Sequence, residues 1–311
     1  MQRFVLLEKV TRRAPLGLRF LDLVREVPVT DGLVVTAWQT GTNNPKYIAM
    51  RSPLSGIYGF RSLPGLRQFE VAERPASDWC GPSSPPASPP AQLTPEELTN
   101  LNTLQALLSS EENTARSNFV IYVSDQMERF LPQLLLMCLP KEELIEVPLF
   151  SSPARPALAG FGTVRGEVAE QGTQPPRPAS WALVTVSPDD DVTTYVAVAD
   201  ARGMFTLYIP YASALPPLQG SPPRGSGTID QLTWRLTIQV FYQPSTQVFI
   251  AGIDPPDTLS ILEQERANVY DQDNIPGSSL FRSISFGGDV VVATSGHSQL
   301  LADPASPPSP P

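Results

Sequence analysis

Histidine and cysteine are scarce in this chain, and each shortage excludes a class of site. The 311 residues include one histidine, His297, and two cysteines, Cys80 and Cys138. A single histidine cannot form a histidine-cluster metal site, and two cysteines are too few for a zinc-binding set or a disulfide framework. We therefore expect no metal and no cofactor. The apolar LLLMCLP context of Cys138 predicts a buried, inert thiol.

Long apolar segments are also missing. The longest one, residues 130–139, covers about ten residues, whereas a membrane-spanning helix needs about 20. The opening MQRFVLLEKV places Glu8 and Lys9 directly after a short apolar run, which leaves no core for a signal peptide. The sequence predicts a soluble cytoplasmic product without a membrane span; a particle that it joins can still be released or membrane-associated.

Lysine is the rarest charged residue. The net charge is −9, and an acidic surface repels phosphate backbones, so we expect no nucleic-acid partner. The 22 basic residues comprise 19 arginines and only three lysines. Arginine is enriched and lysine depleted at protein interfaces, which predicts protein subunits as partners. A GC-rich genome would produce the same bias.

Proline, in contrast, is abundant. The chain has 35 prolines, about twice the usual share of roughly 5%, which argues against a mostly helical protein. Nineteen of them fall in four stretches that read as loops and linkers, at residues 75–95, 175–178, 216–223 and 304–311.

The segments between these stretches are short runs of Val, Ile, Leu and aromatic residues, a pattern typical of strands. The predicted strands cover residues 4–10, 17–24, 33–38, 47–50, 57–60, 119–123 and 133–139, then 163–169, 181–187, 193–199, 204–209, 232–242, 248–253 and 289–294. A helix is predicted over residues 94–108, which open with a capping-box arrangement. A shorter helix is predicted over residues 257–269.

The two sets of strands resemble each other. GLVVTAW at residues 32–38 aligns with WALVTVS at residues 181–187, and each is followed by a strand, a glycine turn and an aromatic-bearing strand. Gly56 and Gly203 occupy the same turn position, where glycine adopts a positive φ without steric cost. We infer two copies of one β-sandwich of about 100 residues.

The second copy resembles the carboxypeptidase regulatory-like module, a transthyretin-like β-sandwich. The resemblance covers roughly residues 162–242 and rests on a D-x-x-G-x-[FY] turn, here Asp200, Gly203 and Phe205. In the first copy Pro53 replaces the aspartate. Such modules serve as stability, spacer and binding domains, so the resemblance implies a fold and leaves the function open.

The predicted fold is therefore mainly all-β, with two tandem antiparallel transthyretin-like or Ig-like sandwiches and a helical, proline-rich insertion in the first. The predicted units are a domain at residues 1–150 with its insertion at 75–118, a linker at 151–161, a domain at 162–303 and a tail at 304–311.

No pattern in the sequence predicts catalysis. His297 is the only imidazole, and the chain contains no G-x-S-x-G nucleophile elbow, so we expect no enzyme and no small-molecule substrate. Three acidic groups have the oxygens that calcium prefers, namely Asp189 to Asp191, Asp254 with Asp257, and Asp271 with Asp273 and Asn274. The third begins like an EF-hand loop, but Pro276 stands where glycine is required.

These observations favour a structural role. The overall layout, with FVLLEKVTRRAPLGLRFLDLV, ERFLP, VPLFSSPAR and FGGDVVVATSG, is similar to baseplate or accessory structural proteins of phage-tail-like contractile injection systems. The alternative is a pair of carbohydrate- or surface-binding modules in which Trp38 or Trp234 forms an aromatic platform. Burial of these aromatic residues in the sandwich cores is the competing interpretation.

Overall fold

The computed structural model describes residues 13–41, 46–71, 118–173, 175–189, 193–211, 233–272 and 275–305. Several sequence predictions lie outside these residues: the strand at 4–10, the helix at 94–108, Cys80, and nearly all of the insertion and the tail. Within the described residues, no helix is long and apolar enough to cross a bilayer.

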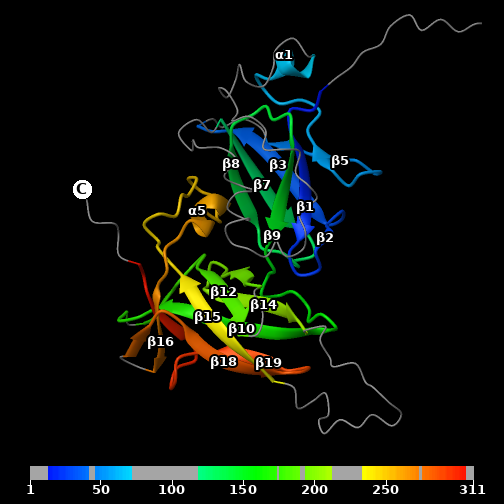
Figure 1. Cartoon of the computed structure of the whole chain (residues 1–311). Helices are drawn as coiled ribbons and strands as arrows, with labels where there is room; N and C mark the ends of the chain where they lie inside the picture. Colours follow the sequence, from blue (N-terminus) through cyan, green and yellow to red (C-terminus); the bar gives the residue numbers. More distant parts are fainter. Residues whose placement is uncertain are drawn as a thin grey trace, which may run out of the picture.

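The first sandwich consists of two sheets (Figure 1). In one sheet, β1 (Gly17–Asp22) pairs antiparallel with β2 (Val27–Pro28) and β6 (Tyr58–Gly59) and parallel with β9 (Leu144–Leu149), while β6 also pairs with β5 (Met50–Arg51). The other sheet has the order β4 (Tyr47–Ile48), β3 (Leu33–Gln39), β7 (Phe119–Asp125) and β8 (Gln133–Met137). A single helical turn, α1 (Arg67–Glu70), follows β6.

The second sandwich is built in the same way. Its β10 (Phe161–Glu170) pairs antiparallel with β14 (Met204–Pro210) and β11 (Arg177–Pro178) and parallel with β19 (Asp289–Val292) and β20 (Leu300–Asp303). Beyond β20 follow β16 (Asn268–Gln272) and β17 (Ile275–Gly277), and the other sheet has the order β13 (Tyr195–Val198), β12 (Leu183–Pro188), β15 (Thr233–Phe241) and β18 (Leu280–Ser285). Helix α5 (Thr258–Leu262) lies between β15 and β16.

Strand pairs of one sheet in the first sandwich match strand pairs of one sheet in the second. The segments aligned in the sequence, 32–38 and 181–187, cover most of β3 and β12, which hold the same place in their sheets. The register of their neighbours is also the same. The matching pairs are Val35–Val123 with Val184–Val240, and Thr36–Ile48 with Thr185–Val196.

Buried and outward-facing side chains alternate along the strands, and the buried ones form each core. On β15, the side chains of Leu236, Ile238 and Val240 are fully buried, and the residues between them face outward. Successive side chains of a strand point to opposite faces of the sheet, so one period-two pattern fills the space between the two sheets. The all-β prediction is confirmed.

Some predicted elements are wrong in the second sandwich. Residues 248–253 form no strand; they belong to the connection after β15, where Ile250 and Ile253 pack against the first sandwich. The helix predicted over 257–269 ends at Leu262, and residues 268 and 269 pair with β20 instead of continuing it. Tertiary pairing overrides weak helical periodicity in this segment. Strands β2, β9, β11, β16, β17, β18 and β20 were not predicted.

Candidate functional site

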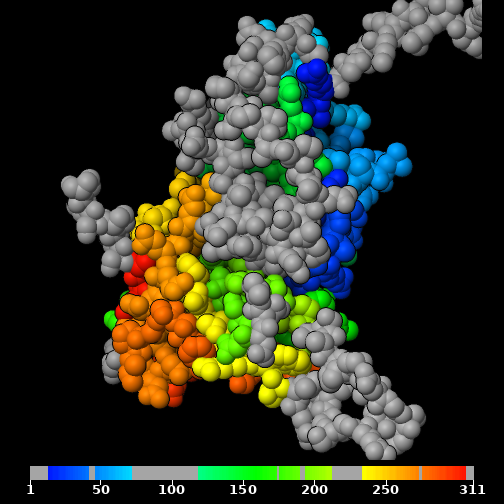
Figure 2. All heavy atoms as spheres, in the orientation of Figure 1, coloured from blue at the N-terminus to red at the C-terminus, as the bar shows by residue number. Residues whose placement is uncertain are grey.

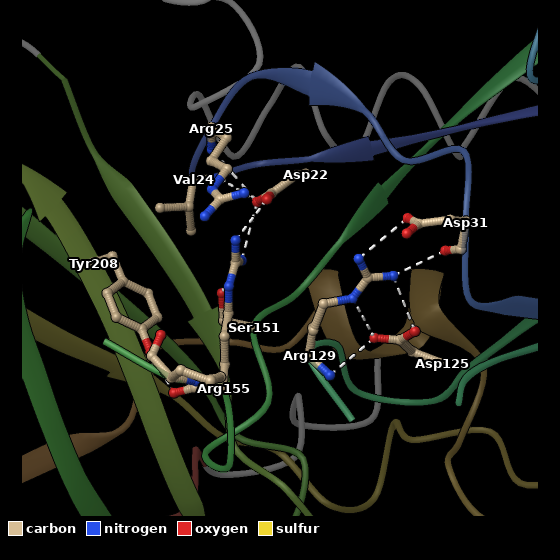
Figure 3. Close-up of polar contacts among 10 residues, drawn as sticks. Asp22, Val24, Arg25, Asp31, Asp125, Arg129, Ser151, Arg155 and Tyr208 are labelled. Atoms are coloured by element: carbon tan, nitrogen blue, oxygen red, sulfur yellow. Dashed lines mark hydrogen bonds and ion pairs between the residues drawn. The ribbon is translucent and has the colours of Figure 1, made fainter. Parts of the chain in front are cut away.

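A buried ion pair lies where the two sandwiches meet (Figure 3). Asp22 ends β1, and Arg155 lies in the linker after β9. Arg155 donates two hydrogen bonds to the Asp22 carboxylate, from Nη1 to Oδ1 at 3.0 Å and from Nη2 to Oδ2 at 2.5 Å. The Arg155 and Asp22 side chains are 4% and 5% exposed. Such bidentate pairs fix geometry as well as adding energy.

Local turns hold both groups in place. Asp22 Oδ1 also accepts hydrogen bonds from the backbone N–H groups of Val24 and Arg25, in a turn that follows β1. Arg155 Nη1 also donates to Oγ of Ser151 at 2.9 Å. The carboxylate is therefore fixed by the first sandwich, and the guanidinium by the linker that leads into the second.

Aromatic rings from both sandwiches surround the guanidinium. Cζ of Arg155 lies 4.9 Å from the ring centroid of Phe130 and 5.6 Å from that of Tyr208, within cation–π range. The Tyr208 hydroxyl donates to the Arg155 carbonyl at 2.8 Å. Burial raises the pKa of Tyr208, and the positive charge of Arg155 opposes this rise. These contacts attach β14 of the second sandwich to the linker.

A second ionic cluster appears in the same view, formed by Arg129, Asp125 and Asp31 (Figure 3). Arg129 donates to both Asp125 carboxylate oxygens, at 3.0 and 3.1 Å, and to Asp31 at 3.2 Å. Burial raises the pKa of Asp125, but the hydrogen bonds from Arg129 outweigh this and hold the pKa below its usual value. Gly32, with a φ of 73°, leaves room for the cluster, because a Cβ there would lie 2.9 Å from Arg129 Nη2.

Apolar side chains complete the junction. One cluster joins Leu131 and Phe150 of the first sandwich to residues of the second: Trp181, Leu183, Val198, Ile261 and Leu262. Another packs Ile250 and Ile253 of the second sandwich against residues of the first: Trp38, Val120 and Leu134. Burial of these side chains from water stabilises the contact.

The segment around α5 also binds the end strand β8. Asp257 Oδ1 accepts the N–H of Leu136 at 2.9 Å, and Thr258 Oγ1 donates to the carbonyl of Leu134 at 2.9 Å. Asp257 is 3% exposed, and burial raises its pKa to about 6 although several hydrogen bonds lower it. The contacts satisfy backbone groups that an edge strand otherwise exposes.

A shallow pocket opens beside the ion pair and is lined by both sandwiches, including Ser151, Tyr208 and Glu26. Burial raises the pKa of Glu26. Among the described lining residues there are hydroxyl groups and one carboxylate, but no imidazole, thiol or amine.

The glycine turn identified in the sequence is present in both sandwiches. Gly56 and Gly203 have φ of 69° and 79°, and their N–H groups close turns onto Ser52 and Asp200. Asp200 Oδ1 accepts the N–H groups of residues 202 and 204, and Phe205 is buried in the core. The turn residues thus shape the fold.

The two tryptophans of the alternative prediction lie at different places. Trp38 is 7% exposed and packs in the junction, with Lys46 Nζ 4.8 Å from its ring, so it presents little ring surface to a sugar. Trp234 is partly buried against the core, and its ring lies 5.7 Å from that of Tyr211. The structure does not bring the two rings into one platform.

Cys138 is buried, as its context predicts, but the expectation of a thiol is wrong. Cys138 is 4% exposed and disulfide-bonded, so it carries no free thiol. His297 lies in an exposed turn, where its N–H donates to the Thr294 carbonyl.

The aspartates proposed as calcium ligands have other partners. Asp189 accepts a hydrogen bond from Thr237 and pairs with Arg235, Asp271 pairs with Arg282, and Asp257 belongs to the junction. Among the described residues, no three His, Cys, Asp or Glu side chains gather in a way that could hold a metal ion. Asp190, Asp191, Asp273 and Asn274 lie outside the described part of the chain.

Comparisons with known proteins add little. No protein-family model matches the chain, and no curated protein sequence matches it. A search of solved structures finds the Bacillus anthracis TIE protein, with 8% identity and a TM-score of 0.19. The match covers 88% of this chain and 44% of that one, so this chain spans less than half of the TIE protein structure. A likeness of this size carries no argument about function.

Proposed function

We propose that this chain is a non-enzymatic structural component of a multi-subunit particle, with protein subunits as its partners. The junction carries the proposal, because a buried bidentate ion pair, two apolar clusters and side-chain to backbone hydrogen bonds connect the sandwiches. Domains in one chain move relative to each other unless their interface is large and apolar. A junction of this kind holds two rigid bodies at one angle, as a connector requires.

Within this class, we assign the chain to the baseplate or accessory proteins of phage-tail-like contractile injection systems. The support is the sequence layout, and two of its segments supply the junction. ERFLP contributes Phe130 and Leu131, and VPLFSSPAR contributes Phe150 and Arg155. The shared strand order supports the further proposal that both sandwiches are transthyretin-like, the second of carboxypeptidase regulatory-like type.

Sedimentation of the native particle tests this function. We expect a tagged chain, expressed in its own host, to sediment with a particle that contains sheath protein. Arg155→Met, which removes the buried cation, should lower its share in that fraction, whereas Arg165→Met, in a pair that is 55% and 52% exposed, should not. The proposal is overturned if the tagged chain stays in the light fractions while sheath particles are present in the same gradient.

A further inference from the structure

A tryptophan at the junction has a left-handed backbone conformation. Trp181 stands just before β12 with a φ of 61°, and it is 4% exposed. Residues other than glycine are uncommon in this region, and a bulky side chain there strains the backbone. Such strain persists only where the surrounding structure holds it, and it concentrates at positions that have a function.

The first sandwich shows what the fold alone requires at this position. Gly32 aligns with Trp181 in the sequence, stands just before β3, and has a φ of 73°. The residue before this strand is therefore left-handed in both sandwiches. Glycine adopts the conformation without strain, so the backbone gives no reason for a tryptophan in the second sandwich, and the reason lies in its ring.

The ring of Trp181 lies in the contact between the sandwiches. It belongs to the apolar cluster that contains Leu131 and Phe150 of the first sandwich. In Figure 1, β12 lies on the side of the lower sandwich that faces the upper one. Tryptophans buried near the centre of an interface contribute a large share of its energy. The strained residue of the second sandwich therefore serves the contact with the first.

The connection from β15 to β16 binds the turn that holds Trp181. Gln264 Nε2 donates to the carbonyl of Trp181 at 2.9 Å, and Gln247 Nε2 donates to the carbonyl of Ser180 at 3.1 Å. The side chain of Trp181 also forms a hydrogen bond with that of Asp254. These bonds couple the position of the ring to the position of the connection.

The same connection reaches the first sandwich. Asp257 Oδ1 accepts the N–H of Leu136 in β8, and Ile253 packs against the first sandwich. In Figure 2 the connection is coloured yellow to orange and lies on the left, where the two sandwiches meet. The burial of the Trp181 ring and the attachment to β8 are therefore parts of one contact.

The linker between β9 and β10 has a segment suited to a hinge. Ala157, Ala159 and Gly160 are exposed. Gly160 has a φ of 85°, and no other atom lies within 4 Å of the place where its Cβ would be. Hinges are short loop segments whose φ and ψ angles absorb a domain motion. The contacts around Trp181, and not this segment, therefore fix the angle between the sandwiches.

We propose that Trp181 is the latch of this junction, the side chain whose burial holds the two sandwiches at one angle. A chain without this ring has two folded sandwiches that swing about residues 157–160. The inference goes beyond the proposed function, because it concerns the purified chain whether or not the chain joins a particle. Failure of either one therefore leaves the other standing.

Hydrogen exchange of the full chain, followed by NMR, tests the latch, because the N–H of Leu136 donates across the junction. In Trp181→Gly we expect this amide to exchange roughly tenfold faster or more, the effect of losing a central interface side chain. Small-angle X-ray scattering should give a larger radius of gyration. Amides in β7 and β15 should keep their wild-type protection, because glycine suits the left-handed turn and both sandwiches stay folded.

Two further variants separate the ring from the backbone. Trp181→Ala also removes the ring but keeps a Cβ at a positive φ. It should speed the exchange of Leu136 as much as Trp181→Gly does, and it should unfold at a lower urea concentration than Trp181→Gly. Trp234→Ala is the matched control, because it removes the same ring from a cluster with Tyr211 inside the second sandwich. It should leave the exchange of Leu136 unchanged.

Four results would overturn the inference. Unchanged Leu136 exchange and an unchanged radius of gyration in Trp181→Gly would show that the ring does not hold the junction. Loss of protection in β15 would show that the ring belongs to the core of its own sandwich. Equal effects of Trp234→Ala and Trp181→Gly on Leu136 would remove the special role of Trp181. Equal urea midpoints for Trp181→Gly and Trp181→Ala would contradict the backbone strain from which the argument starts.

Discussion

Replacing Arg155 by methionine removes the cation of the buried pair at little change in volume. Asp22 is then left 3% exposed with no positive partner, and removing one member of a buried pair costs about 3–5 kcal/mol of unfolding free energy. Two backbone N–H groups still donate to Oδ1 of Asp22. We therefore expect a loss near the lower end, about 3 kcal/mol.

Urea unfolding followed by circular dichroism measures this loss. The control is Arg165→Met, whose pair with Asp289 is 3.5 Å long and about half exposed on both sides, and which should lose less than about 1 kcal/mol. Adding Asp22→Asn to Arg155→Met removes the stranded charge and should recover part of the loss. A loss for Arg155→Met no larger than that of the control would refute the reasoning about the junction.

Three further outcomes are expected. The pKa of Asp257 is about 6 in the native state and about 3.9 in the unfolded state. Between these two pH values the native state therefore binds more protons than the unfolded state. Stability should therefore fall by about 3 kcal/mol as the pH rises from about 3 to about 7, and Asp257→Asn should abolish this slope in urea unfolding at several pH values. Gly203→Ala should lower the melting temperature more than Gly172→Ala. Both glycines have φ near 80°, but only at Gly203 would a Cβ lie 2.3 Å from a β10 carbonyl oxygen. Equal falls in melting temperature for the two variants would contradict this expectation. Iodoacetamide should label Cys138 in the denatured protein only after reduction, and mass spectrometry that finds the label before reduction would contradict the disulfide.

Local patterns were sufficient for the strands with clear alternation. Leu236, Ile238 and Val240 on β15 alternate with outward residues, and such a pattern reports directly on which side faces the core. The segment 257–269 shows the limit. Its apolar spacing fits a helix imperfectly, and pairing of residues 268 and 269 with β20 decides the conformation of its end. That partner lies about 30 residues further along the chain, beyond any local pattern.

The candidate site was not predicted, because its members come from distant positions. Asp22 and Arg155 are 133 residues apart, and each alone reads as an ordinary surface charge. A carboxylate within the apolar run LRFLDL was the available signal for Asp22. The signal for Arg155 was its place at the end of VPLFSSPAR, a segment noted only for its layout.

The sequence by itself determined the repeated strand order, the glycine turns and the two cores, since these depend on side-chain alternation and on φ preferences at single residues. Only the tertiary structure decided how the sandwiches meet and which outer faces stay open. Val196 and Ile48 read alike in the sequence, yet the first is covered by a neighbouring sandwich and the second is 68% exposed. Burial of an outward strand residue depends on what packs against the sheet, and strand periodicity contains no information about that neighbour.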